Sequence, residues 1–390
     1  MKIAFFTLLS PIQSALSDCA EGLALAMANI PEVIIDLFIN DDYQPDTPAI
    51  LEQFNIYTYH EFASRADLYD ICLYWVGDHG DYHGFMFDFI HRYPGVLVLN
   101  DTTLHRAVMT TTLYRGNEQS YLDEMKYAYN INDLRVAKQI EAGDGDYIIL
   151  KYPLFERMVN SSLGVVLHNN YARLQVLMRC PNAKVKRIFY PFFIPPATTE
   201  FDLHEKRKEK RAELGLENYF VVGAFGIFVP NKHLEDCLNA FANVVKIYPQ
   251  SKFILGGFAI PEYDLAGYIQ EIGLTEHVII TGWLPPKAFS EMMFALDVGI
   301  HLRYPHIGGT PYTPIRLMGV NACTIVSDIE PLAEVPQGAC IKIIPDMYQF
   351  DTLNAILTHL VNNRNFCRQV ADNGQQFIEK YHHLHHVAQQ

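Results

Sequence analysis

The sequence predicts an α/β protein with two doubly wound parallel sheets, one in each half of the chain. Short continuous apolar runs alternate with longer amphipathic segments, which is the rhythm of β-α-β units. This rhythm breaks at a proline-containing stretch over residues 190–196 and then restarts. The chain has 390 residues, which is enough for two domains of ordinary size.

In the first half, the short runs are apolar throughout, as expected of strands buried on both faces of a parallel sheet. The predicted strands are Ile3–Leu9, Ile34–Ile39, Ile71–Val76, Val96–Leu99 and Leu163–Leu167. The first run is too short for a signal peptide and has no small-residue cleavage site after it. Helical periodicity follows over Ser17–Ala28 and His83–His91.

The second half repeats this pattern. Its predicted strands are Phe220–Phe225, Phe253–Leu255, Val278–Thr281, Val298–Leu302, Thr324–Val326 and Ile341–Ile344. Its predicted helices are His233–Tyr248, Leu265–Ile272, Lys287–Ala295, Pro314–Val320 and, with a break, Phe350–Lys380. The charged stretch His204–Gly215 is typical of a solvated helix. We expect domains over 1–195 and 217–375, a linker over 196–216, and a terminal helix or tail over 376–390.

Composition excludes several classes of protein. The formal net charge is -14, which argues against binding nucleic acid through a general basic surface. No run of about 18 apolar residues is present, so we expect no transmembrane helix. The 7 cysteines are scattered and lack C-x-x-C spacing, which favours buried, reduced thiols in a cytoplasmic protein.

One strand-to-helix connection is unusual for an acidic chain. It reads HLRYPHIGGTPYTPIRLMG over 301–319. Gly308 and Gly309 allow a close approach of the backbone, and Thr313 and Pro314 are typical of a helix start. Free N–H groups at a helix start form a natural phosphate site. Arg303 and Arg316 would add positive charge there, or could serve as structural ion-pair partners.

A second stretch, FGIFVPNKHLEDCLNAF over 225–241, predicts a strand, a glycine turn, a lysine and an amphipathic helix. Lys232 falls at the helix start, where a cation opposes the helix dipole. A bound anion would offset this unfavourable interaction of the ammonium with the helix dipole. The alternative is an ordinary surface lysine whose stem lies along the protein.

These two stretches resemble the donor half of the retaining glycosyltransferases of family 4, which have the GT-B fold. The resemblance continues in order through ITGWLPPKAF, TIVSD and IEPLAEVP. In the first half, SPIQSALSDCAEGLALAMA, YWVGDHGDYHGFMFDFIHRYPGVLVLNDTTLH and YPLFERMVNSSLGVVLHN are similar to successive blocks of one subgroup. The resemblance spans nearly the whole chain and implies two Rossmann-like domains that face a cleft, with the last helix crossing back to the first domain.

The resemblance implies roles for residues of the second half. Lys232 and Arg303 would act in catalysis by stabilising the donor diphosphate, and Trp283 and Leu284 would line the nucleobase pocket. The other implied donor contacts are Gly226, Gly308, Gly309, Thr310, Pro311 and Arg316.

In the first half, the resemblance places Ser14 and Ala15 near the donor phosphates or the acceptor. The implied acceptor-side residues are His83, Asn100 and Asp101, and the implied catalytic residue of this half is His105. No protein nucleophile is implied.

The implied activity is transfer of a sugar, with retention, from a nucleotide-diphosphate sugar to a glycan, lipid-linked saccharide or other glycoconjugate. No cofactor or metal is obligatory for it. The resemblance allows a peripheral membrane contact and leaves the oligomeric state open.

Three departures from the family keep an alternative open. A glycine, Gly308 or Gly309, stands where the family has a glutamate. Residues 227–229 lack an arginine that many members have, and Asn100 replaces a histidine of the subgroup. The alternative is a glycosyltransferase-like binding or scaffold subunit with impaired catalysis; a nucleotide-sugar epimerase is a third interpretation.

Two further patterns could suggest a metal site. Asp144-Gly145-Asp146 matches a D-x-D motif but lies in a glycine-rich turn, and His382 and His386 have helical spacing near the chain end. A structural turn and an exposed tail explain them more simply, so we predict no metal site. The glycines Gly223 and Gly226 are too few for a dinucleotide fingerprint.

Overall fold

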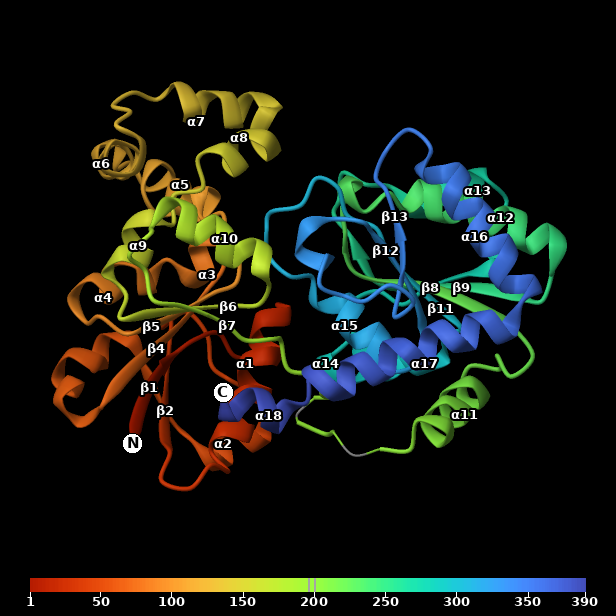
Figure 1. The fold of residues 1–390 in the computed structure, drawn as a ribbon, viewed down its shortest axis with the longest axis horizontal. Coiled ribbons are helices and arrows are strands. Elements are labelled where there is room, and N and C mark those ends of the chain that lie inside the picture. Colours follow the sequence, from red (N-terminus) through yellow and green to blue (C-terminus); the bar gives the residue numbers. More distant parts are fainter. Residues whose placement is uncertain (196, 200) are drawn as a thin grey trace. The chain divides into compact units, whose positions relative to one another are not determined.

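The computed structural model describes residues 1–390 apart from Pro196 and Glu200, and apart from the side chains of Asp144 and Asp146. The chain forms two compact units (Figure 1). Unit 1 comprises Met1–Pro191, Pro305–Thr310 and Leu384–Gln390. Unit 2 comprises Phe192–Tyr304 and Pro311–His383.

Unit 1 contains a parallel sheet of seven strands within the described residues, in the order β3-β2-β1-β4-β5-β6-β7. The strands are β1 (Lys2–Phe6), β2 (Ile34–Ile39), β3 (Asn55–Thr58), β4 (Ile71–Val76), β5 (Val96–Leu99), β6 (Gly164–Leu167) and β7 (Val185–Arg187). The strand order reverses direction between β1 and β4, as in doubly wound folds. The edge strands β3 and β7 escape sequence prediction because they are short and contain polar residues.

The helices of unit 1 connect and cover this sheet. They are α1 (Ala15–Met27), α2 (Pro48–Gln53), α3 (Gly80–His83), α4 (Phe85–Arg92), α5 (His105–Thr111), α6 (Glu118–Tyr129), α7 (Arg135–Gln139), α8 (Gly145–Lys151), α9 (Glu156–Ser161), α10 (Asn170–Arg179) and α18 (Leu384–Gln389). The chain end α18 packs on α1. The core includes stacked rings: the centroid of Phe6 lies 5.0 Å from that of Phe38 and 4.7 Å from that of Tyr74.

Unit 2 contains a parallel sheet of six strands within its described residues, in the order β10-β9-β8-β11-β12-β13. They are β8 (Phe220–Phe228), β9 (Ser251–Ala259), β10 (Val278–Ile280), β11 (Val298–His301), β12 (Cys323–Ser327) and β13 (Ile341–Ile343). The helices are α11 (Leu203–Glu213), α12 (Leu234–Ile247), α13 (Leu265–Glu271), α14 (Pro286–Met292), α15 (Tyr312–Gly319), α16 (Gln349–Asn362) and α17 (Arg364–Tyr381). Two parallel-sheet units therefore confirm the predicted fold class.

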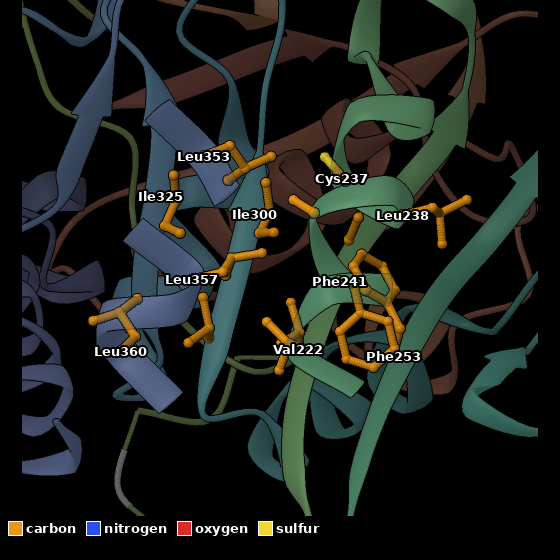
Figure 2. Close-up of a cluster of buried hydrophobic side chains, with 14 of the residues drawn as sticks. Val222, Cys237, Leu238, Phe241, Phe253, Ile300, Ile325, Leu353, Leu357 and Leu360 are labelled. Atoms are coloured by element: carbon orange, nitrogen blue, oxygen red, sulfur yellow. The ribbon is translucent and has the colours of Figure 1, made fainter. Parts of the chain in front are cut away.

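The core of unit 2 forms where α12 and α16 pack on one face of the sheet (Figure 2). Val222 and Phe253 project from neighbouring strands toward Phe241 of α12. Leu353 and Leu357 of α16 lie over Ile300 and Ile325 in the same cluster. All these side chains are buried, so this packing fixes α12 and α16 on the sheet.

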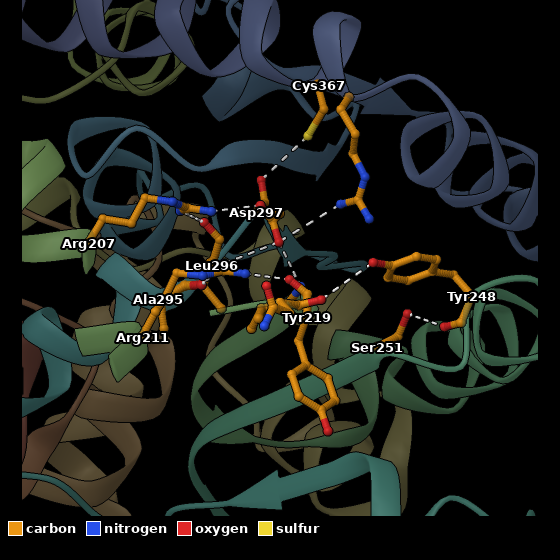
Figure 3. A network of polar contacts seen from close by, with 12 residues as sticks. Arg207, Arg211, Tyr219, Tyr248, Ser251, Ala295, Leu296, Asp297 and Cys367 are labelled. Carbon is orange, nitrogen blue, oxygen red and sulfur yellow. Dashed lines mark hydrogen bonds and ion pairs between the residues drawn. The ribbon is translucent and has the colours of Figure 1, made fainter. Parts of the chain in front are cut away.

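The prediction that the charged helix over 204–215 is simply solvated is wrong for one of its faces. Arg207 and Arg211 of α11 reach Asp297, at 2.6 and 3.3 Å between guanidinium and carboxylate (Figure 3). The same carboxylate accepts a hydrogen bond of 2.8 Å from the Val221 backbone N–H. A charge pattern alone cannot show which basic residues meet a partner distant in the sequence.

Two boundaries differ from prediction near the candidate site. Strand β8 continues through Gly226 to Phe228 and pairs with β9 as far as Ala259, so the predicted turn at Gly226 is wrong. Helix α15 begins at Tyr312 after Pro311, which has no side-chain cap, so Thr313 is not the N-cap.

The cysteines agree with prediction: all seven lie in the described part of the chain, and all are buried and free. No helix in the described residues is long and apolar enough to cross a membrane.

Candidate functional site

Lys232 ends a short 3₁₀ turn, Pro230–Lys232, that links β8 to α12. Its ammonium Nζ donates a hydrogen bond of 3.2 Å to the carbonyl oxygen of Phe225. Gly226 has a φ of 113°, and a Cβ on it would lie 2.7 Å from Nζ. The glycine therefore supplies both a left-handed backbone and the space that the ammonium occupies.

The segment after β11 lies beside this turn. The N–H of Tyr304 donates to the carbonyl of Asn231 at 2.9 Å, and Nε2 of His233 lies 3.0 Å from the carbonyl oxygen of Tyr304. The Arg303 N–H donates to the hydroxyl of Ser327 at 2.9 Å. These bonds hold Arg303 close to Lys232, at the carboxyl ends of β8 and β11, where ligands of doubly wound sheets bind.

Lys232 and Arg303 form a cationic group at this edge of the sheet. Burial, and then the charge of Arg303, lowers the pKa of Lys232 to about 7. His301 ends β11 in the same group, and burial together with both neighbouring cations lowers its pKa well below 6.5. A phosphate among these groups would relieve their repulsion and restore the charge on Lys232.

Apolar side chains surround the same strand ends. Ile227, Ile280 and Trp283 are 45%, 49% and 46% exposed. Trp283 and Leu284 follow β10 and precede α14, and they are candidates to meet a flat base. A Cβ on Gly257 would lie 2.1 Å from the carbonyl oxygen of Gly226, so these paired glycines let β8 and β9 come together here.

Arg316 lies buried in α15, in the same unit. Its guanidinium carbon is 4.4 Å from the centroid of the Tyr312 ring and 5.7 Å from that of Phe289. Aromatic faces stabilise a guanidinium that has left water. A donor contact by Arg316 stays a prediction.

The predicted phosphate loop, Pro305–Thr310, groups with unit 1. A Cβ on Gly308 would lie 1.9 Å from Oγ1 of Thr102, and one on Gly309 would lie 2.4 Å from Oδ1 of Asp101. The side-chain amide of Asn169 donates to Oγ1 of Thr310 at 2.8 Å. The two glycines predicted a close approach to the backbone, and here the approaching atoms are those of Thr102 and Asp101. Phosphate contacts by this loop and by Pro311 stay predictions.

Three predicted residues of unit 1 lie together at the carboxyl ends of β4 and β5. The carboxylate of Asp101 accepts hydrogen bonds from the Asp78 N–H and the Asn100 amide, both at 3.1 Å. A Cβ on Gly77 would lie 3.1 Å from this carboxylate and 3.3 Å from Nε2 of His83. Burial lowers the pKa of His83 to about 3, so its ring is neutral at physiological pH.

The first loop of unit 1 reaches the same group. Oγ of Ser14 accepts a hydrogen bond of 3.2 Å from the Leu16 N–H, which caps α1 at Ala15. The side chain of Leu16 lies 3.0 Å from the position of a Cβ on Gly77. The predicted residues Ser14 and Ala15 are therefore close in space to the implied acceptor-side group.

His105 has different surroundings. Its ring is fully buried, with Nε2 2.9 Å from the hydroxyl of Tyr121 and Nδ1 hydrogen bonded to the carbonyl of Tyr152. Burial lowers its pKa to about 4. Both ring nitrogens have protein partners, which is typical of a core residue, and a catalytic role for His105 stays a prediction.

Sequence reasoning missed Asp78, which follows β4. Its carboxylate accepts a hydrogen bond of 2.9 Å from the Ala107 N–H in α5. Burial, which outweighs this bond, and the nearby Asp101 charge raise the pKa of Asp78 to about 8. The sequence held one signal for this residue: Asp78 is an acidic residue just after a predicted strand, where ligands of doubly wound sheets bind.

Among the described side chains, no group of three or more His, Cys, Asp or Glu residues could hold a metal ion. The side chains of Asp144 and Asp146, which carry the D-x-D pattern, lie outside the described residues.

The structure thus has two parallel-sheet units, and unit 2 carries a cationic group that is a candidate phosphate site. Residues 206–377 match the model of the family Glycosyl transferases group 1. This match confirms the resemblance to glycosyltransferases that the sequence blocks predicted. No curated protein sequence matches the chain.

Solved structures share the fold over the whole chain. HepE from Anabaena, in complex with UDP, is 18% identical with a TM-score of 0.66, over 100% of this chain and 98% of that one. Sucrose-phosphate synthase from Thermosynechococcus elongatus is 13% identical with a TM-score of 0.65, over 100% and 96%. WaaG, a glycosyltransferase involved in lipopolysaccharide biosynthesis, is 12% identical with a TM-score of 0.64, over 99% and 98%.

Proposed function

We propose that this protein is a retaining glycosyltransferase. It moves a sugar from a nucleotide-diphosphate sugar to a glycan, lipid-linked saccharide or other glycoconjugate. The observation that carries the proposal is the half-buried residue Lys232, which lies near Arg303 and has a pKa lowered to about 7. Two cations at a ligand-binding strand edge fit a diphosphate.

The chemistry follows from the charge of the leaving group. When the bond between the sugar and the diphosphate breaks, negative charge grows on the diphosphate oxygens. In this proposal Lys232 and Arg303 would contact those oxygens, and would therefore stabilise the transition state more than the ground state. These cations supply the charge that a divalent metal supplies elsewhere, so we propose that turnover needs no metal.

Unit 1 would supply groups for the acceptor. Asp101, Asn100 and His83 offer a carboxylate, an amide and a neutral imidazole within one small group. Carboxylates and amides bind sugar hydroxyls through hydrogen bonds. Retention would follow a front-face route, in which a phosphate oxygen of the leaving group accepts the proton of the acceptor hydroxyl.

The comparisons support a uridine nucleotide as the first donor to test. HepE structures hold UDP and UDP-glucose, and their fold matches the whole of this chain at 17–18% identity. In this chain, Trp283 and Leu284 would contact the base.

The test is a thermal-shift and titration series with UDP, GDP, ADP, dTDP and CMP and their common sugars, with and without Mg²⁺. We expect one nucleoside diphosphate to raise the midpoint without metal, because a ligand that binds the native state alone stabilises it. Lys232→Ala should abolish this shift, and the control Lys246→Ala, on the exposed side of α12, should retain it.

No shift with any nucleotide would overturn the proposal. Binding without transfer or hydrolysis, across a broad panel of acceptors, would instead favour the binding-subunit alternative. Conversion of the sugar without an acceptor would indicate an epimerase.

A further inference from the structure

His301 is a buried residue that the sequence reasoning did not single out. It is 6% exposed, and its Nε2 atom is buried without a hydrogen-bond partner among the described residues. A buried polar atom without a partner is rare in native proteins and needs an explanation. A ligand that supplies the missing partner is one such explanation.

The position of His301 indicates which ligand. Ile300 pairs with Ala224 across β11 and β8, so His301 follows the last pair of this ladder. The residue after Ala224 is Phe225, whose carbonyl oxygen accepts a hydrogen bond of 3.2 Å from the Lys232 ammonium. Arg303 follows His301 by two residues, just after the end of β11.

The surroundings of His301 decide the charge of its ring. Burial, and then the nearby charges of Lys232 and Arg303, lower the pKa of His301 well below 6.5. The imidazole is therefore neutral in the free protein, and a neutral ring carries a proton on one of its nitrogens. With that proton on Nε2, the ring offers a fixed N–H donor beside two cations.

We propose that His301 is a third diphosphate-binding residue, beside Lys232 and Arg303, and that its Nε2–H donates a hydrogen bond to a phosphate oxygen of the nucleotide-diphosphate donor. This inference rests on the proposed function. It assigns the diphosphate a neutral hydrogen-bond donor in addition to its two cations.

The experiment titrates UDP, GDP and ADP, each by calorimetry, into the full chain and two variants. His301→Leu keeps a buried apolar group of similar size, and His301→Gln keeps an N–H donor. We expect His301→Leu to weaken the diphosphate that binds by about tenfold or more, the range of a hydrogen bond to a charged group. His301→Gln should stay within about threefold of the unchanged protein.

A measurement on the free protein separates this role from a structural one. Removing an unpartnered buried polar atom relieves a desolvation penalty, so the thermal midpoint of His301→Leu should be unchanged or higher. His277 provides the matched control, because it precedes β10 at the opposite ends of the strands and its Nδ1 lies 3.1 Å from the Ser251 carbonyl oxygen. His277→Leu should leave diphosphate affinity unchanged.

An unchanged affinity in His301→Leu, with or without a lower midpoint, overturns the assignment of His301 while leaving the proposed function intact. A lower affinity in both His301→Leu and His301→Gln, accompanied by lower midpoints, overturns it as well, because the loss then follows from misfolding. If the unchanged protein binds none of these three diphosphates and no other nucleotide of the thermal-shift series, the proposed function fails together with this inference.

Discussion

The ammonium of Lys232 occupies the space that a side chain on residue 226 would need: a Cβ on Gly226 would lie 2.7 Å from Nζ. Gly226 also has a φ of 113°, a conformation that other residues rarely adopt. The glycine in β8 is therefore a condition for the position of the proposed phosphate-binding cation.

Gly226→Ala should displace Lys232 and weaken nucleoside-diphosphate binding by about tenfold or more, the loss expected for a charge-assisted hydrogen bond. Calorimetric titration would measure it. Gly273→Ala is the control, because Gly273 also has a positive φ, 73°, but has no atom within 4 Å of its Cβ position. Equal losses of affinity in the two variants would show that backbone strain, and not the space for Lys232, is responsible.

Donor affinity should depend on pH through Lys232. Its pKa is about 7 in the free protein, and a bound diphosphate would raise that pKa. Binding therefore takes up a proton above pH 7, and affinity should fall as pH rises from 7 to 8.5, by at most about tenfold per pH unit for one proton. Lys232→Arg, which stays charged, should lack this dependence. A flat profile in the unchanged protein would contradict the assignment of Lys232.

Asp78 should make the stability of the protein depend on pH. Its pKa of about 8 lies above the usual value near 4, so the folded protein holds a proton that the unfolded chain releases. Its contribution to stability is therefore lost as pH rises from about 4 to about 8. Asp78→Asn keeps the acceptor for the Ala107 N–H and removes the titration. We expect its thermal midpoint to exceed that of the unchanged protein by more at pH 8.5 than at pH 5.5. A constant difference between the two proteins would contradict this role.

Asp297 should be a strong determinant of the stability of unit 2. Asp297→Asn leaves Arg207 and Arg211 without their anion, and we expect a loss of about 2–3 kcal/mol, below the full cost of breaking a buried pair because the carboxylate is partly exposed. Urea unfolding, followed by tryptophan fluorescence, would measure this loss. In a Trp75→Phe background the signal comes from Trp283, the tryptophan of unit 2. Asp351→Asn, at an exposed position of α16, is the control and should change stability by under about 0.5 kcal/mol. Equal stability of Asp297→Asn and Asp351→Asn would contradict this prediction.

The local sequence was sufficient for the two parallel sheets and for most of their strands. Continuous apolar runs such as Val96–Leu99 and Val298–Leu302 predict buried parallel strands because burial on both faces requires apolar side chains at every position. Lys232 was also recognisable, since a cation at a helix start is unfavourable without an anion.

Only the tertiary structure decided the surroundings of these residues. Nothing near His301 in the sequence shows that its Nε2 lacks a partner, and nothing near Gly309 shows that Asp101 fills the space beside it. The same holds for the arginines of α11 and their shared carboxylate on Asp297. The physical reason is common to all three: strand direction and helix periodicity are set by neighbouring residues, whereas burial, pKa and hydrogen-bond partners depend on residues that folding brings together from distant parts of the chain.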